Sequence, residues 1–489
     1  MNKRNTYFVE LLLFTLIFAQ AVSHAQSNFH SNERIKKLDA YLAEYQKNKA
    51  VASISAGAIQ KGKIIWQNAF GYADISHKVP ATPNTVYRIA SISKLVTAVA
   101  VMQLVEKGKI KLDEDARKYI PYFPKKKWKF TVRQILQHTA GLRTYRKGEF
   151  NSTNFYSSTR EAVGVIQNDS LVYKPGTKYV YTTLGYNLLA AIIEDASGLS
   201  FTDYLRKYIF EPAEMNSTYP EFHQKIIMNK AVGYVKNKYR NFENAPLADL
   251  SIKFAGGGLI STSGDLLKFA NAILLNKFIK HSTLDSMLVP VKLLNGRAID
   301  CGLGFEIKHD KNNKFFYGHF GYGTGFISLL AIFPEDSLAV VDLINTDDRN
   351  LGGPALDLAS IILNKPFNYP LKPLQDKMME FTLSKGIDSA ISFYKMIKTD
   401  SANYYDLSAE AFNEVGYDLL KIKDRKSAIR WFSFYADEFP QNISPYLGLG
   451  DTYYNDNNKG LARKYYRKAL KIDFNNSYAK QMISKLESD

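Results

Sequence analysis

The sequence predicts an α+β domain, an antiparallel sheet flanked by helices plus a helical subdomain, followed by an all-helical domain. Three observations lead to this prediction. Strand-like segments lie at both ends of residues 33–365, helical patterns lie between them, and a 34-residue spacing recurs beyond residue 376. Strands at the two ends of one domain pair most simply in a single antiparallel sheet on which the helices pack. A chain of 489 residues is long enough for two such domains.

The first 25 residues have the pattern of a secretory signal peptide. Basic residues precede a mainly apolar stretch from Tyr7 to Val22, and Ser23-His24-Ala25 supplies small residues before an expected cleavage after Ala25. The apolar stretch is short for a membrane span, so we expect no transmembrane segment after signal removal. The sequence therefore predicts an exported bacterial protein, either periplasmic or secreted.

The N-terminal part of the first domain combines helices and strands. Residues 33–47 have helical apolar spacing, whereas residues 51–60 and 63–70 have the character of two paired strands. Residues 95–105 are apolar on every side, which predicts a buried central helix. Gly108 then suits the C-terminal cap of that helix.

Shorter elements fill the rest of this domain. Residues 184–196 predict a helix that Gly198 can cap. The run Gly256-Gly257-Gly258 predicts a tight turn that only glycine adopts easily, and Ser263 is the expected N-cap of the helix that follows. The closing strand-like runs are residues 302–307, 314–318, 326–333 and 339–344.

The second domain is predicted from a linker and a repeat. Three prolines in residues 366–375 indicate the linker. Residues 376–489 repeat with a period of 34, which is typical of tetratricopeptide-like helix pairs. Such repeats could bind a protein partner that the sequence does not identify. The small residues that recur at this spacing are Gly416 and Gly450, and Ala428 and Ala462.

Composition narrows the classes of partner. The 64 Lys and Arg against 47 Asp and Glu give a net charge of +17, and Lys125-Lys126-Lys127 is the densest basic cluster. A solvated loop is the favoured interpretation of that cluster, and attraction to an anionic envelope is the alternative. Without a recognised binding motif we expect no nucleic-acid partner. Cys301 is the only cysteine, so the chain forms no internal disulfide.

The most informative chemical pattern is Ser91-Ile92-Ser93-Lys94, which introduces the apolar run of the predicted central helix. One helical turn brings the hydroxyl and the amine to the same face. A desolvated lysine shifts toward its neutral, basic form, which can activate a serine hydroxyl. Ser-x-x-Lys also occurs at Ser392 and at Ser477, but both copies lie in expected surface helices. Only the copy at Ser91 opens a buried one.

In Ser91-x-x-Lys94, Tyr181 and His319-Phe320-Gly321 the chain resembles the serine β-lactamase-related family of class C β-lactamases, D-alanyl-D-alanine peptidases and related esterases. The resemblance covers roughly residues 51–345, and within residues 245–275 it is nearest to the LACTB-like branch. It implies a β-lactamase/transpeptidase-like fold and a serine hydrolase that forms an acyl-enzyme on a small-molecule or peptide substrate. No metal or organic cofactor is needed for this chemistry.

The resemblance also implies roles for the catalytic residues. Ser91 would be the acylated nucleophile, and Lys94 would share or relay its proton. Tyr181 matches a family tyrosine that acts as base and then acid. An unperturbed tyrosine titrates near ~10, so Tyr181 needs Lys94 nearby to be useful at neutral pH.

Four further residues are expected to bind substrate. His319 and Gly321 match the strand that borders the site, where glycine lets substrate approach closely. The amide of Tyr322, with that of Ser91, would form the oxyanion hole. Thr183 stands where the family usually has asparagine, and a single hydroxyl replaces an amide that both donates and accepts.

We therefore expect an exported serine hydrolase that cleaves an amide or ester. Two alternatives remain open. One is a DD-peptidase or β-lactamase acting on cell-wall-like substrates, which Thr183 argues against mildly. The other is an inactive hydrolase fold that serves, with its repeats, as an interaction scaffold, which the presence of Ser91, Lys94 and Tyr181 argues against.

Overall fold

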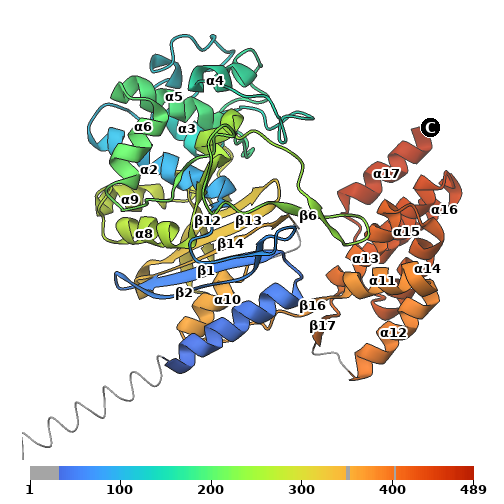
Figure 1. Cartoon of the computed structure of the whole chain (residues 1–489). Helices are drawn as coiled ribbons and strands as arrows, with labels where there is room; N and C mark the ends of the chain where they lie inside the picture. The colour runs from blue at the N-terminus through green and yellow to red at the C-terminus, as the bar shows by residue number, and fades with distance from the viewer. Residues whose placement is uncertain (1–31, 348–352, 401–403, 489) are drawn as a thin grey trace, which may run out of the picture. The chain divides into compact units, whose positions relative to one another are not determined.

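The computed structural model describes residues 32–347, 353–400 and 404–488 (Figure 1). The predicted signal peptide at residues 1–25 lies outside these residues. The described chain forms two compact units. The first contains residues 32–46, 51–234 and 244–369, and the second contains residues 47–50, 235–243 and those from 370 onward.

A seven-stranded sheet is the centre of the first unit, in the order β11-β12-β13-β14-β1-β2-β3 (Figure 1). Neighbouring strands run antiparallel. The two ends of the domain meet where β1 pairs with β14, with Ala56 opposite Asp342. The predicted α+β architecture is therefore confirmed. The strands are β1 (Ser53–Gln60), β2 (Lys63–Asp74), β3 (Val79–Pro80), β11 (Glu306–His309), β12 (Phe315–Gly323), β13 (Phe326–Phe333) and β14 (Leu338–Ile344).

The two faces of the sheet belong to different hydrophobic cores. Along β1, Ile54, Ala56 and Ala58 share a core with the helix over residues 32–48 and with α10 (Ala355–Ile362). Along β14, alternate residues such as Val341 belong instead to the core that contains α2. This alternation follows from the two-residue period of a strand, and it places helices on both faces.

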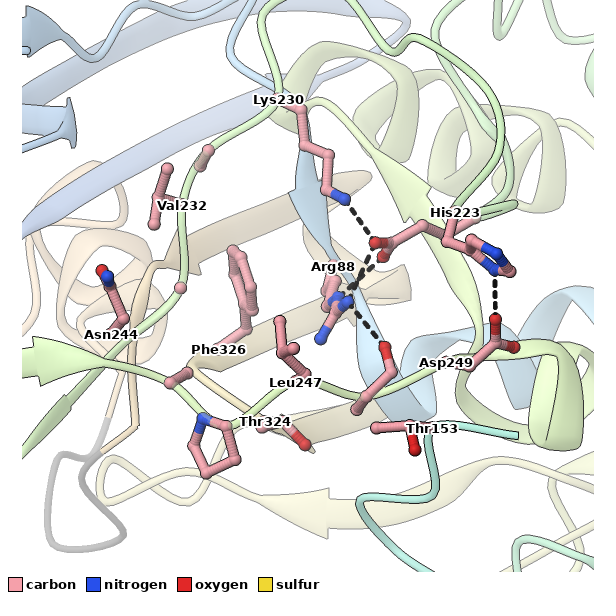
Figure 2. Close-up of a pocket in the computed structure, with 16 residues that line it drawn as sticks. Arg88, Thr153, His223, Lys230, Val232, Asn244, Leu247, Asp249, Thr324 and Phe326 are labelled. Atoms are coloured by element: carbon pink, nitrogen blue, oxygen red, sulfur yellow. Dashed lines mark hydrogen bonds and ion pairs between the residues drawn. The ribbon is translucent and has the colours of Figure 1, made fainter. Parts of the chain in front are cut away.

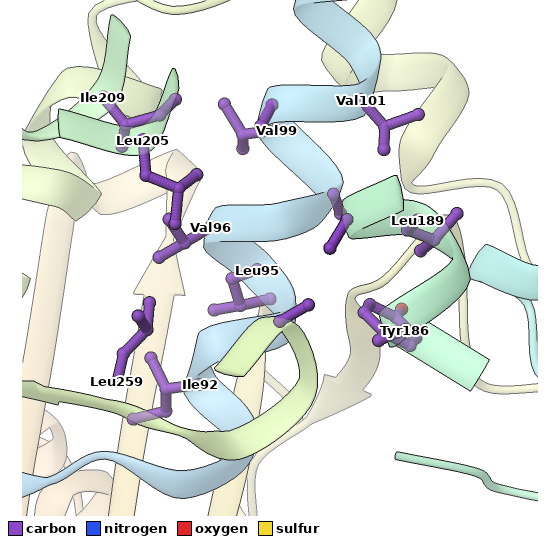
Figure 3. Close-up of a cluster of buried hydrophobic side chains, with 14 of the residues drawn as sticks. Ile92, Leu95, Val96, Val99, Val101, Tyr186, Leu189, Leu205, Ile209 and Leu259 are labelled. Atoms are coloured by element: carbon purple, nitrogen blue, oxygen red, sulfur yellow. The ribbon is translucent and has the colours of Figure 1, made fainter. Parts of the chain in front are cut away.

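Helix α2 (Ser93–Glu106) is the buried central helix that the apolar run predicts. Every residue from Ser93 to Leu104 is buried. Figure 3 shows its side chains, including Leu95 and Val99, packed among residues of the neighbouring helices and of β8 (Leu259–Ser261). Gly108 follows the helix with φ of +69°, a left-handed conformation that glycine adopts without strain. The predicted end of this helix is confirmed.

Several shorter helices complete the first unit. Helix α5 ends where predicted, because Gly198 is its C-cap with φ of +74°. Strand β11 begins only at Glu306, since Gly304 turns the chain before it with φ of +83°. The helices are α3 (Val132–Leu136), α4 (Thr159–Gln167), α5 (Gly185–Ser197), α6 (Phe201–Leu205), α7 (Phe254–Gly257), α8 (Ser263–Leu274) and α9 (His281–Met287).

Two local predictions were wrong. The N-cap of α8 is Thr262, whose Oγ1 accepts a hydrogen bond from the amide of Asp265 at 3.2 Å, and not Ser263. The hydroxyl of Ser263 instead bonds Ser55 of the sheet. Gly256 lies in the short helix α7 and not in a tight turn. Glycine is needed there because a Cβ would lie 2.6 Å from the carbonyl oxygen of Thr183.

The second unit is helical and contains the 34-residue repeat. Gly416 of α13 and Gly450 of α15 face an aromatic ring of the next helix, Phe432 and Tyr466 respectively, and a Cβ at either glycine would clash with that ring. Helix α11 begins at Leu374, inside the predicted linker. The helices are α11 (Leu374–Lys385), α12 (Ile387–Asp400), α13 (Ala409–Lys421), α14 (Arg425–Glu438), α15 (Ser444–Asn455), α16 (Lys459–Ile472) and α17 (Ser477–Ser488).

Among the described residues, no helix combines the length and the apolar character that a membrane span requires.

Candidate active site

Ser91 lies in a single 3₁₀ turn, Ala90–Ile92, between β4 (Tyr87–Arg88) and the start of α2. The residue before it, Ala90, has φ of +45°, a backbone conformation that residues other than glycine rarely adopt. Such strain persists only where neighbouring structure enforces it. Here Ser328 of β13 donates a hydrogen bond from its hydroxyl to the carbonyl oxygen of Ile89 at 2.9 Å, which ties the turn to the sheet.

Gly321 is part of the same docking arrangement. A Cβ at this position would lie 2.1 Å from the hydroxyl oxygen of Ser328 and 2.6 Å from the carbonyl oxygen of Ile89. The space that a side chain would need is therefore filled by the turn that carries Ser91. In the structure, glycine lets β12 approach this turn, and the close approach of substrate to Gly321 stays a prediction.

Lys94 lies in the first turn of α2 and is completely buried. Its Nζ is 3.0 Å from Ser91 Oγ, 2.5 Å from the carbonyl oxygen of Gly256 and 3.3 Å from Thr183 Oγ1. Burial, followed by the positive charge of Lys253, holds the pKa of Lys94 well below its usual value. A neutral amine has two N–H groups, which Gly256 and Thr183 can accept, and one lone pair that remains for the proton of Ser91.

Tyr181 also reaches Ser91, and its ring centroid lies 4.7 Å from Lys94 Nζ. Its hydroxyl donates to Ser91 Oγ at 2.7 Å. Burial raises the pKa of Tyr181 well above its usual value, and the hydrogen bond between Tyr181 and Ser91 only partly opposes that rise. The phenol is therefore protonated at neutral pH. In this form it can give a proton to a leaving group but cannot take one from Ser91.

His138 holds the segment that carries Tyr181. Its carbonyl oxygen accepts from the amide of Val180 at 3.0 Å, and its Nδ1 accepts from the amide of Thr182 at 3.2 Å. Its ring lies 4.4 Å from the ring of Tyr181, measured between centroids. The backbone of His138 has φ of +57°, an uncommon conformation for a residue other than glycine. These contacts hold the backbone on both sides of Tyr181 and support its ring.

His319 lies on β12 near the ring of Tyr181, with the two ring centroids 6.1 Å apart. It is buried, and its Nδ1 donates to the carbonyl oxygen of Phe320 at 2.6 Å. Burial lowers the pKa of His319 to about 4, although Glu306 acts in the opposite direction. The imidazole is therefore neutral at pH 7 and supplies no positive charge to the site.

A narrow pocket opens at Ser91 and brings together Thr183, Tyr322 and Lys253. The ring of Tyr322 stacks on that of Phe150, with centroids 6.1 Å apart. Lys253 and Phe150 are not among the site residues predicted from the sequence. The one local feature of the sequence that could have indicated Lys253 is its position in an apolar, glycine-rich stretch. In the described residues, His, Cys, Asp and Glu side chains form no cluster of three that could hold a metal ion.

A larger cavity of about 660 Å³ adjoins this pocket, with Arg88 and Thr324 lining both (Figure 2). Phe326 and Val232 form part of its apolar wall. Its volume falls within the range of pockets that bind small organic ligands. Ser91 therefore lines a narrow pocket that shares two lining residues with a roomier cavity.

The fold and this arrangement can be compared with known proteins. A family model described as Beta-lactamase matches residues 38–361. The chain belongs to the beta-lactamase family. The resemblance to this family and the predicted fold are thereby confirmed, and the chain is a serine hydrolase of β-lactamase/transpeptidase-like fold.

Relatives of this β-lactamase-family chain include eukaryotic and bacterial proteins. It is 30% identical over 388 residues to the human mitochondrial serine beta-lactamase-like protein LACTB. The match covers 58% of this chain and 69% of that protein. A penicillin-binding protein of Bacillus subtilis is 28% identical over 352 residues, covering 68% and 76% of the two chains. The solved structure of the octameric penicillin-binding protein homologue from Pyrococcus abyssi matches with a TM-score of 0.58 at 26% identity, covering 68% and 78%.

Proposed function

We propose that this chain is an exported serine hydrolase that cleaves an amide or ester through an acyl-enzyme on Ser91. The observation that carries the proposal is the convergence of two groups on one oxygen. Lys94 Nζ and the Tyr181 hydroxyl lie 3.0 Å and 2.7 Å from Ser91 Oγ. One group is a buried neutral amine and the other a protonated phenol, so a base and an acid both contact a single nucleophile.

Acylation proceeds in two steps. Lys94 takes the proton of Ser91 while Ser91 Oγ attacks the carbonyl carbon, and the carbonyl oxygen becomes an oxyanion. The amides of Ser91 and Tyr322 stabilise that oxyanion. When the tetrahedral intermediate collapses, the leaving group receives a proton from Tyr181, which recovers one from Lys94. Each proton taken from Ser91 thus ends on the departing amine or alcohol.

Deacylation repeats these steps with water in place of the leaving group. Lys94 accepts a proton from water as the water attacks the acyl carbon, and Ser91 Oγ receives that proton when the ester bond breaks. Thr183 binds Lys94 through its hydroxyl and also lines the pocket, so it contributes to orienting both the base and the substrate. His319 contributes shape and hydrogen bonding but no charge.

The substrate is a small molecule or a short peptide. The cavity of about 660 Å³ beside the narrow pocket accommodates the part of the substrate that does not react. The alternative of a DD-peptidase or β-lactamase shares these catalytic residues and differs only in substrate. The similarity to a penicillin-binding protein of B. subtilis supports that alternative.

Export and a protein partner complete the proposal. The pattern of residues 1–25 supports export to the periplasm or medium. The 34-residue repeat, with a glycine facing an aromatic ring in each unit, supports tetratricopeptide-like repeats over residues 376–489. Through these repeats the chain could bind a protein. An inactive scaffold would share the repeats but not the reactivity of Ser91.

The test compares two reagents on the full chain. A fluorophosphonate reports a reactive serine, and a fluorescent penicillin reports recognition of a β-lactam. Labelling by the fluorophosphonate alone supports an esterase or peptidase, and labelling by both supports the DD-peptidase or β-lactamase alternative. Labelling by neither contradicts catalysis and supports the scaffold.

A further inference from the structure

The last two helices of the second unit, α16 and α17, pack side by side and carry a strongly basic surface (Figure 1). Helix α16 has six basic residues and no acidic one. Lys464, Lys468 and Lys471 are exposed and share one face, because side chains three or four residues apart on a helix are neighbours. Within the described chain the only ion pair of α16 joins Arg467 to Glu487 of α17 at 3.6 Å. The three lysines of this face therefore have no carboxylate partner among the described residues.

Two apolar side chains are exposed at the carboxyl end of the same helix. Ile472 is the last residue of α16, and Phe474 follows it; they are 38% and 76% exposed. The ammonium of Lys480, on α17, stands 4.5 Å from the centroid of the Phe474 ring. Cations and exposed apolar groups thus meet in one region. We call it the α16–α17 surface, and it consists of Lys464, Lys468, Lys471, Ile472, Phe474 and Lys480.

The 34-residue repeat does not require this surface. The equivalent positions one repeat earlier, in and just after α14, hold one basic and two acidic residues together with a phenylalanine and a proline. They are Arg430, Phe434, Asp437, Glu438 and Pro440. Helix α14 packs in its own pair with these residues, so the lysines and exposed apolar side chains are particular to the last pair.

The combination matches the chemistry of a membrane interface. The phosphates of anionic lipids attract lysine side chains, and the boundary between headgroups and acyl chains accepts phenylalanine and isoleucine. An acidic peptide would pair with the lysines but would leave Phe474 and Ile472 without a role. Both kinds of side chain therefore favour a lipid surface over an acidic protein.

We propose that the α16–α17 surface binds an anionic phospholipid membrane. Its four lysines contact headgroup phosphates, while Ile472 and Phe474 enter the boundary between headgroups and acyl chains. The attachment is peripheral and needs no membrane-spanning helix. This inference goes beyond the proposed function and is independent of the chemistry at Ser91. In an exported chain, it would hold the hydrolase at the membrane.

The test is flotation of the protein with phospholipid vesicles. Residues 1–25 are omitted, because the apolar stretch from Tyr7 to Val22 would bind vesicles by itself, and the remaining chain keeps every residue that the structure describes. One set of vesicles contains phosphatidylglycerol and phosphatidylcholine in equal parts, and the other contains phosphatidylcholine alone. The partition coefficient should be at least ~10-fold higher for the anionic set, because each basic residue at an anionic surface strengthens binding roughly fivefold.

A triple variant tests the lysines of α16. Lys464→Gln, Lys468→Gln and Lys471→Gln together should lower the partition coefficient for anionic vesicles by about 10- to 100-fold. The matched control is Lys125→Gln, Lys127→Gln and Lys129→Gln together, which removes the same charge from exposed positions in the densest basic cluster of the chain. This control should bind as the wild type does. Circular dichroism shows whether each variant is folded.

A single variant tests the apolar part of the surface. Phe474→Ser keeps every charge and changes a side chain that packs little, so the fold should survive while vesicle binding falls severalfold. The residual binding should disappear when salt screens the lysines. The matched control is Ile226→Ser in the first unit, where the side chain is 94% exposed, and it should bind as the wild type does.

Three results would overturn the inference. The first is equal partition of the wild type to anionic and neutral vesicles, which needs no variant. The second is an equal loss of binding in the two triple variants, which would assign the attraction to the net charge of the chain. The third is wild-type binding by Phe474→Ser, which would leave a basic surface for acidic polymers in general and not a membrane site.

Discussion

Replacing Lys253 by methionine should change how the stability of the catalytic unit depends on pH. Burial, and then the charge of Arg88, lower the pKa of Lys253 from 10.5 to about 8, with Glu221 opposing this. The other groups that face it are the phenol of Tyr145, whose burial raises its pKa, and the neutral Lys94. The folded state thus binds the Lys253 proton more weakly than the unfolded state does.

The sign follows from proton linkage. Between pH 8 and 10.5 the unfolded chain binds more protons at Lys253 than the folded chain, so wild-type stability rises with pH across this window. The difference of about 2.5 pH units between 10.5 and 8 corresponds to a penalty of about 3 kcal/mol well below pH 8, which mostly vanishes above pH 10. Lys253→Met has no such group and no such penalty.

Urea unfolding of both proteins at pH 7 and pH 10 measures this effect. Fluorophosphonate labelling at each urea concentration reports the catalytic unit alone. The free energy of unfolding of the wild type relative to the variant should improve by roughly 2 to 3 kcal/mol from pH 7 to pH 10. Groups common to both proteins cancel in this comparison. Parallel pH profiles would refute the reasoning, because they would mean that Lys253 is not charged and buried in the folded state.

Three further variants test the roles assigned around Ser91. Tyr181→Phe keeps the ring but removes the proton donor, so kcat should fall ~10² to 10⁴-fold on every substrate, and a near wild-type rate would place the acid elsewhere. His138→Phe removes the acceptor for the Thr182 amide, so kcat should fall while circular dichroism shows an intact fold; a change in KM alone would contradict a positioning role. Thr183→Val keeps the shape but deprives Lys94 of an acceptor worth ~0.5–1.5 kcal/mol, so kcat should drop up to about tenfold, and an unchanged kcat would show that this hydrogen bond does not matter.

Local sequence patterns predict the elements that are determined by residues close together in the sequence. The apolar run after Ser91 predicts α2 because a helix buried on all sides needs apolar residues on all sides. Ser91 and Lys94 are found for the same reason, since one helical turn separates them. Tyr181 needed the family resemblance, because its position beside Ser91 depends on the fold and not on sequence spacing.

The features that escaped prediction arise from contacts between distant segments. Thr262 and Ser263 suit an N-cap equally by type, and only the sheet residue Ser55 decides which hydroxyl is used. The reason for Gly321 is the turn at Ile89, which no local pattern reveals. Lys253 resembles a surface lysine in the sequence, and only the packing of Phe150 over it makes it a buried charge.

The central claim is that Ser91 is the nucleophile of a serine hydrolase, and mapping the covalent adduct tests it most directly. The full chain is treated with a fluorophosphonate, digested, and analysed by mass spectrometry, alongside the variant Ser91→Ala, which loses only a hydroxyl. We expect a single adduct on the peptide that contains Ser91 and none in the variant. An adduct on any other residue, or labelling that survives in Ser91→Ala, would contradict the account.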